Sequence, residues 1–240
     1  NSTNDLYIGV HGSTLNNYFT GYLDNIRIIK GEALYTTTTN NIDLTETSNI
    51  ILHIQSNYND SSNATLITND LSSQPNFNGT INIDSFIFDG NDDYFEIPAN
   101  IAPQLAGSDF TIEFWAKLQP QPKSCSIILQ GLARSYRTGQ TNVLHIDLNE
   151  PDSTYANAAH TPPQLWNDCL QMTIYDHTHT SGSGTGVRYH RMKVTQYYNI
   201  WTHFALIFNT SDNSFKWYIN GILQDMNDTD HNTGTSSVVL

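Results

Sequence analysis

Short stretches in which apolar and polar residues alternate run along most of the chain. Residues 110–118 give the clearest case, because Phe110, Ile112, Phe114, Ala116 and Leu118 point one way and the residues between them point the other. Residues 201–208 are apolar on both faces, which predicts a central strand covered on both sides. The pattern allows a helix at most in residues 99–107. The chain is therefore predicted to consist of strands.

The same criteria predict roughly a dozen strands in all. They fall at residues 6–10, 22–29, 50–55, 85–88, 94–97, 110–118, 126–131, 143–148, 170–176, 187–196, 201–208 and 215–219. Turn residues predict hairpins around residues 89–93, around the Gly-Ser tip at 181–186 and at Asn220-Gly221. This arrangement predicts an all-β protein made of two packed antiparallel sheets.

The strand predicted at residues 22–29 carries core-type residues near the start of the chain. A regular alternation would place Tyr22, Asp24, Ile26 and Ile28 on one face, with Leu23, Asn25, Arg27 and Ile29 on the other. Asp24 is then expected among isoleucines, where a carboxylate needs N–H donors, an arginine or a metal ion.

Three parts follow from the distribution of these strands: terminal strands in residues 1–35, a polar linker in residues 36–49, and a main body in residues 50–240. A body that ended at Leu240 would expose an unpaired sheet edge, and the first strands supply what that edge needs. The strands are expected to complete the sheet in the same chain, in a neighbouring copy by strand donation, or as part of a tandem repeat. A repeating, fibre-like assembly of copies is the favoured expectation.

The charge balance narrows the list of partners. Ten basic and 23 acidic residues give a net charge of −13, which argues against binding to nucleic-acid phosphates. Acidity of this kind suits an extracellular, cell-surface or virion-surface protein. No stretch is apolar for long enough to insert into a membrane, and no signal-peptide pattern is present.

Cysteines and sequons add candidate covalent modifications. Cys125 and Cys169 each stand at the start of a predicted strand, so they form either a disulfide or two buried free thiols. Three N-x-S/T sequons lie in turn-like settings that would permit glycans in a secreted protein, at Asn59, Asn63 and Asn227.

Several segments resemble the laminin-G-like, concanavalin A-like jelly-roll family. They are residues 86–98 (FIFDGNDDYFEIP), 109–117 (DFTIEFWAK), 201–206 (WTHFAL), 217–221 (WYING) and 19–28 (FTGYLDNIRI). Residues 30–36 (KGEALYT) resemble the ending found in phage and viral tail-fibre or surface proteins. The resemblance implies an antiparallel jelly-roll β-sandwich. Two departures are the order of the segments, with the family's terminal strand first, and residues 149–200, which match nothing specific.

The resemblance implies a non-catalytic structural or adhesive module of an extracellular or virion-surface fibre. The alternatives are a glycan-binding lectin domain and a glycoside hydrolase. Residues 145–150 (HIDLNE) are similar to the E-x-D-x-x-E strand of retaining glucanases, but His145 replaces the first carboxylate. Asp147 and Glu150 share a face only if a bulge intervenes, so no catalytic activity is expected.

Calcium is the candidate cofactor, because many members of the family bind it in loops at the edge of the sandwich. The sequence offers hard oxygen ligands in two turns and a nearby strand, at Asp24, Asp60, Asp89, Asp92 and Asp93. The alternative is that these residues simply favour turns. A transition metal is a weaker candidate, with His177, His179 and His190 as ligands.

Aromatic residues give the candidate glycan site. Trp166 in the Pro-rich loop 149–168 is the preferred position, with Tyr155, Trp115 and Tyr189 as further stacking residues for cell-surface glycans. Packing inside the protein is the alternative role for each of them.

Overall fold

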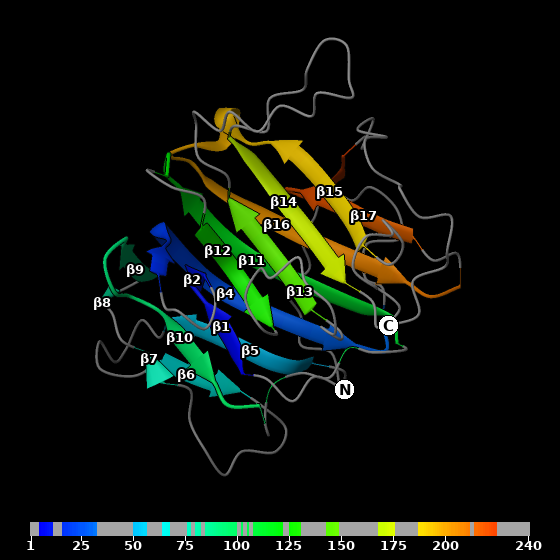
Figure 1. Cartoon of the computed structure of the whole chain (residues 1–240), viewed down its shortest axis with the longest axis horizontal. Coiled ribbons are helices and arrows are strands. Elements are labelled where there is room, and N and C mark those ends of the chain that lie inside the picture. The colour runs from blue at the N-terminus through cyan, green and yellow to red at the C-terminus, as the bar shows by residue number, and fades with distance from the viewer. Residues whose placement is uncertain are drawn as a thin grey trace.

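Two antiparallel β-sheets pack face to face in the computed structural model of the chain (Figure 1). The structure describes residues 5–11, 16–32, 50–56, 64–67, 76–77, 80–82, 85–99, 102, 105, 108–121, 125–130, 143–148, 168–175, 187–211 and 214–224. The predicted linker and most of the stretch 99–107 lie outside these residues. A turn of 3₁₀-helix, Thr195–Tyr197, occupies the end of the strand predicted at residues 187–196.

The first sheet has seven strands in the order β15-β14-β13-β12-β1-β10-β7. Their bounds are β1 Leu6–Ile8, β7 Asn76–Phe77, β10 Phe95–Ile97, β12 Cys125–Gln130, β13 Val143–Leu148, β14 Cys169–Tyr175 and β15 Val187–Lys193. A separate two-stranded ribbon joins β2 (Val10–His11) to β3 (Asn16–Tyr18).

The second sheet has nine strands, seven of them in the order β18-β17-β16-β11-β4-β5-β6. The remaining two, β9 and β8, extend from the first half of β4. Their bounds are β4 Thr20–Lys30, β5 Ile50–Ser56, β6 Ala64–Ile67, β8 Thr80–Asn82, β9 Ser85–Asp89, β11 Phe110–Leu118, β16 Trp201–Asn209, β17 Ser214–Ile219 and β18 Ile222–Leu223.

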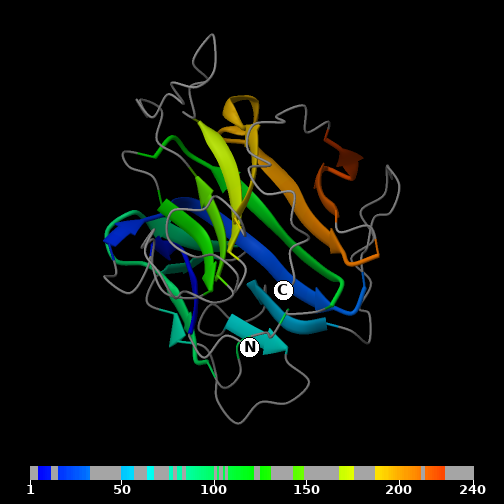
Figure 2. The same cartoon turned by 45° about the vertical axis from the view of Figure 1, so that its right-hand side comes forward.

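The first strands of the chain occupy central positions in both sheets. β1 lies between β12 and β10, and β4 lies between β11 and β5 (Figure 2). Each of these pairings is made within one chain. In this chain the first strands and the main body therefore form one β-sandwich.

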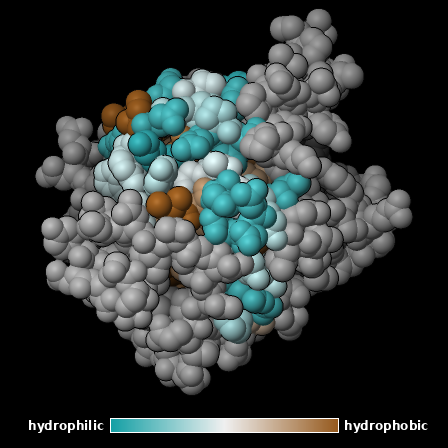
Figure 3. Space-filling model, turned by 90° about the vertical axis from the view of Figure 1, so that its left-hand side faces the viewer, coloured by the Kyte–Doolittle hydropathy of each residue, from teal (hydrophilic) through white to brown (hydrophobic). Residues whose placement is uncertain are grey.

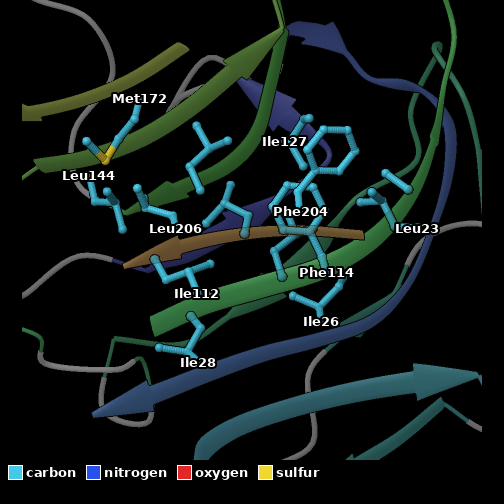
Figure 4. Close-up of a cluster of buried hydrophobic side chains, with 14 of the residues drawn as sticks. Leu23, Ile26, Ile28, Ile112, Phe114, Ile127, Leu144, Met172, Phe204 and Leu206 are labelled. Carbon is cyan, nitrogen blue, oxygen red and sulfur yellow. The ribbon is translucent and has the colours of Figure 1, made fainter. Parts of the chain in front are cut away.

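The space between the sheets holds the main hydrophobic core. Alternating residues of both sheets meet there, including Leu23, Ile26, Ile28, Ile112, Phe114, Ile127, Leu144, Met172, Phe204 and Leu206 (Figure 4). The five residues predicted to share one face of β11 all belong to this core. β16 is buried from Thr202 to Phe208, which confirms the prediction of a strand covered on both sides.

A β-bulge in β4 overturns the predicted position of Asp24. Glu113 pairs with Arg27 and Trp115 with Asp24, so Asn25 and Ile26 together face a single residue of β11. Asn25 has a φ of 49°, and the extra residue reverses the alternation at this point. Asp24 consequently points away from the core, whereas Ile26 and Ile28 join Leu23 inside it.

The predicted hairpin of residues 85–97 is also wrong. β9 pairs with β4 and β8 in the nine-stranded sheet, while β10 pairs with β1 and β7 in the other sheet. The turn at residues 90–94 thus carries the chain from one layer to the next. The other two predicted hairpins, β14–β15 and β17–β18, are present.

Candidate functional site

Three of the predicted calcium ligands converge on the turn that links the two sheets. The carboxylates of Asp89, Asp92 and Asp93 place ligand oxygens within 4.8 Å of one another. Oxygens that share a calcium ion lie up to about 5 Å apart, because each Ca–O distance is about 2.3–2.6 Å. The spacing of the three aspartates therefore fits a hard divalent cation.

Hydrogen bonds within the turn hold these carboxylates in place. Asp89 Oδ1 accepts from the backbone N–H of Asn91 at 2.8 Å, and Asp93 Oδ2 accepts from the N–H of Asp89 at 2.7 Å. Bonds from Asn91 lower the pKa of Asp89. Burial raises the pKa of Asp93, and the charges of Asp89 and Asp92 add to the rise. A cation at this turn would offset that crowding of negative charge.

Asp24, a fourth predicted calcium ligand, does not join the turn. Asp24 pairs with Trp115, on the outer face of the nine-stranded sheet, and does not belong to the acidic group found among the described residues. Asp60 lies outside the described residues.

Aromatic residues from three adjacent strands form a stripe on that same outer face. The aromatic stripe consists of Tyr22 on β4, Trp115 on β11 and Trp201 on β16. Lys117 pairs directly with both Tyr22 and Trp201, and its Nζ lies 5.5 Å from the centre of the Tyr22 ring. The rings of Tyr22 and Trp201 are 6.3 Å apart at 60°. Trp201 is the most exposed of the three, at 39%, and Tyr22 and Trp115 are partly exposed.

Sequence reasoning identified Trp115 but missed Tyr22 and Trp201. The sequence does not show in which register β4 and β16 pair with β11. Residues 22 and 201 are far apart in the sequence, and only the pairing of β4 and β16 with β11 brings them together on one face.

Farther along the same face lies a buried polar network. Arg27 Nη2 forms an ion pair with Glu113 Oε1, and His203 Nε2 lies 3.1 Å from Glu113 Oε2. His53 Nε2 contacts Asn25 Oδ1 at 2.7 Å. Arg27, Glu113 and His203 are each at most 1% exposed, so this network offers no open binding surface.

In the segment that resembles the glucanase motif, Asp147 lies among buried polar residues. Asp147 accepts a hydrogen bond from Ser126 Oγ at 2.6 Å and lies 3.9 Å from His145 Nδ1. All three residues are buried. None of these contacts is with a second carboxylate, the partner that a retaining glucanase requires. Glu150 lies outside the described residues.

Cys125 and Cys169 are both buried and are not joined in a disulfide. β13 separates β12 from β14, and two interstrand spacings amount to roughly 9–10 Å. A disulfide bridges Cα atoms at most about 7 Å apart. The alternative of two buried thiols is the one that the structure shows.

Most of the remaining predicted site residues are not among those that the structure describes. Trp166, Tyr155, His177, His179 and the sequons at Asn59, Asn63 and Asn227 lie outside the described residues. His190 and Tyr189 occupy β15, opposite Met172 and Thr173.

Comparison with known families agrees with this architecture. A family model described as the concanavalin A-like lectin/glucanases superfamily matches residues 89–239. The chain belongs to this superfamily. No match was found among curated proteins or among solved structures.

The matched range of this concanavalin A-like chain begins at Asp89, so β1 and β4 both precede it. The structure nevertheless places these strands in the middle of the two sheets.

In the part of the chain that the structure describes, no helix is both long and apolar enough to cross a membrane.

Proposed function

We propose that this concanavalin A-like chain is a non-catalytic glycan-binding module of an adhesive surface or fibre protein, and that the aromatic stripe contacts the sugar. The exposure of Trp201 next to Tyr22 carries the proposal. A large aromatic side chain left 39% exposed on an ordered strand loses burial energy that packing would otherwise supply. The apolar C–H face of a pyranose can cover such rings.

Polar groups lie within and beside the stripe. Lys117 lies between Tyr22 and Trp201, and Asp24 pairs with Trp115 one row farther along the strands. Both side chains are partly exposed. A few polar groups beside an apolar surface give orientation and specificity to a bound ligand. The charges of Lys117 and Asp24 are opposite, so the stripe favours neutral sugars.

Glycan-array binding tests the proposal. We expect saturable binding to neutral glycans that is lost in Trp201→Ala and weakened in Trp115→Ala. Tyr94→Leu, which removes an aromatic ring from the outer face of the other sheet, serves as the control and should bind like the unmodified protein. Saturable binding that survives Trp201→Ala, or no binding to any glycan, would rule out the stripe as the site.

A second candidate function is self-association, in agreement with the fibre expectation. Ile222 and Leu223 form the edge strand β18 and are 52% and 41% exposed. An exposed apolar edge strand can pair with another chain.

Sedimentation velocity at increasing concentration should show association that Ile222→Lys with Leu223→Lys abolishes. Because β1 and β4 pair in cis, dilution should return every particle to the 27.0 kDa monomer; complexes that persist on dilution would indicate strand exchange instead.

A further inference from the structure

A second group of aromatic side chains lies on and beside the outer face of the seven-stranded sheet. This tyrosine cluster consists of Tyr7 on β1, Tyr18 on β3 and Tyr94 immediately before β10. The ring of Tyr94 is central, with centroids 6.3 Å from Tyr7 and 6.4 Å from Tyr18. All three side chains are partly exposed. Leu6 and Ile8 flank Tyr7 and enter the core, so the alternation of β1 directs the tyrosine outward.

Two carboxylates converge on one hydroxyl of this cluster. Tyr7 Oη lies 3.4 Å from Asp5 Oδ2 and 3.2 Å from Glu96 Oε1. A phenol carries a single proton, so it can donate fully to only one of the two carboxylates. None of the ion pairs between described residues includes Asp5 or Glu96. Asp5 Oδ1 also accepts from the backbone N–H of Ala99 at 2.8 Å. The two like charges beside one phenol nevertheless favour a bound cation.

The wider surroundings are negative as well. The charge of Asp92 acts on Tyr18, and Asp92 belongs to the acidic turn beside Tyr94. The side of the molecule that carries β9 and β10 is mostly hydrophilic in its described part, with small separate hydrophobic spots (Figure 3). The chain as a whole carries −13, which raises the local concentration of cations.

We propose that the tyrosine cluster binds the ammonium group of a small organic cation. The negative faces of aromatic rings attract ammonium ions, and adjacent carboxylates complement their charge. This combination distinguishes the tyrosine cluster from the aromatic stripe, where Lys117 occupies the cation position over Tyr22. The two surfaces belong to different sheets, so the two proposals can fail independently.

Choline chloride and its uncharged isostere 3,3-dimethyl-1-butanol form a matched pair of probes. Saturation-transfer NMR should show saturable binding of choline and at least threefold weaker binding of the isostere. Tyr94→Leu and the isosteric Glu96→Gln should each weaken choline binding at least threefold, whereas Tyr22→Leu on the other sheet should leave it unchanged. Thermal melts of the variants check that they are folded.

Three results would overturn the proposal. The first is equal binding of choline and the alcohol, which would indicate a hydrophobic contact without charge recognition. The second is choline binding that Tyr94→Leu and Glu96→Gln leave unchanged. The third is no choline binding at about 100 mM, a concentration that exceeds a Kd of about 1 mM a hundredfold.

Discussion

Arg27 on β4 and Glu113 on β11 form an ion pair on the face of the nine-stranded sheet that points away from the core, and neither side chain is more than 1% exposed. The pair joins the N-terminal strands to the main body of the sandwich. His203 on β16 contacts the second oxygen of Glu113, so three neighbouring strands share one carboxylate. This network makes the register of β4 against β11 specific, because a slip would leave charges buried without partners.

Replacing Glu113 by alanine should destabilise the fold strongly. The substitution leaves the Arg27 guanidinium buried without its carboxylate partner, a change that costs about 3–5 kcal/mol in the free energy of unfolding. Urea unfolding measures the cost. The double variant Arg27→Met with Glu113→Leu removes both charges and should be less destabilised than Glu113→Ala. A loss below about 1 kcal/mol for the single variant would mean that water reaches the pair.

Much of the fold could be predicted because strand patterns are local. The bounds of β11 and β13 match the predicted residues 110–118 and 143–148, since their alternation is regular and covers one face. The Asn220-Gly221 turn takes positive φ at both residues, as its sequence indicates. These segments lie within residues 89–239, the range that the superfamily model matches.

The remaining features depend on contacts that a local pattern does not contain. The bulge at Asn25 changes which residues of β4 face the core. The sequence of residues 20–30 does not predict the extra residue. Residues 89–93 suit a hairpin turn equally well, but β10 finds its partner in the other sheet. The aromatic stripe and the tyrosine cluster each combine residues from three separate segments, so only the assembled sheets reveal them.

Gly9 should tolerate no side chain. It has a φ of +90°, and an added Cβ would collide with the ring of Phe88 in the core. Its N–H also donates to Ile127 O at 2.9 Å, which fixes the backbone. We expect Gly9→Ala to destabilise the fold by about 2–5 kcal/mol, the sum of left-handed strain and overpacking.

Gly31 supplies a matched control for that substitution. Its φ of +82° is similar, but an added Cβ meets nothing within 4 Å. Gly31→Ala should therefore cost only the backbone strain, about 1–2 kcal/mol. Equal losses in the two variants, measured by urea unfolding, would show that the Phe88 ring moves aside at no cost.

The two cysteines should be unreactive in the folded protein. Burial raises the pKa of the Cys125 thiol well above its usual range, and Cys169 is only 5% exposed. Because the thiolate is the reactive form, Ellman's reagent at pH 8 should label neither cysteine in the native state. In guanidinium chloride without reductant, two thiols per chain should react. No reaction under those conditions would show that the cysteines had formed a disulfide.

Replacing Asp93 by asparagine should change the melting temperature in opposite directions without and with calcium. Because burial raises the pKa of Asp93, its ionised form is disfavoured in the folded state and costs stability at pH 7. Without calcium, Asp93→Asn should therefore raise the melting temperature at pH 7, and the gain should vanish below the unfolded-state pKa of about 3.9. The asparagine keeps an oxygen to accept the N–H of Asp89, so the turn should remain intact.

Calcium should reverse that ranking. If Asp89, Asp92 and Asp93 bind the ion, calcium at 100 times its Kd stabilises the unmodified protein by about 2.7 kcal/mol, whereas Asp93→Asn loses one of three charged ligands and gains less. Melting curves with calcium and with chelator measure the effect, and Asp24→Asn, outside the acidic turn, serves as the control. An unmodified protein that melts at the same temperature in calcium and in chelator would leave the three aspartates with a structural role in the turn, and Asp93→Asn would then remain the more stable form in both.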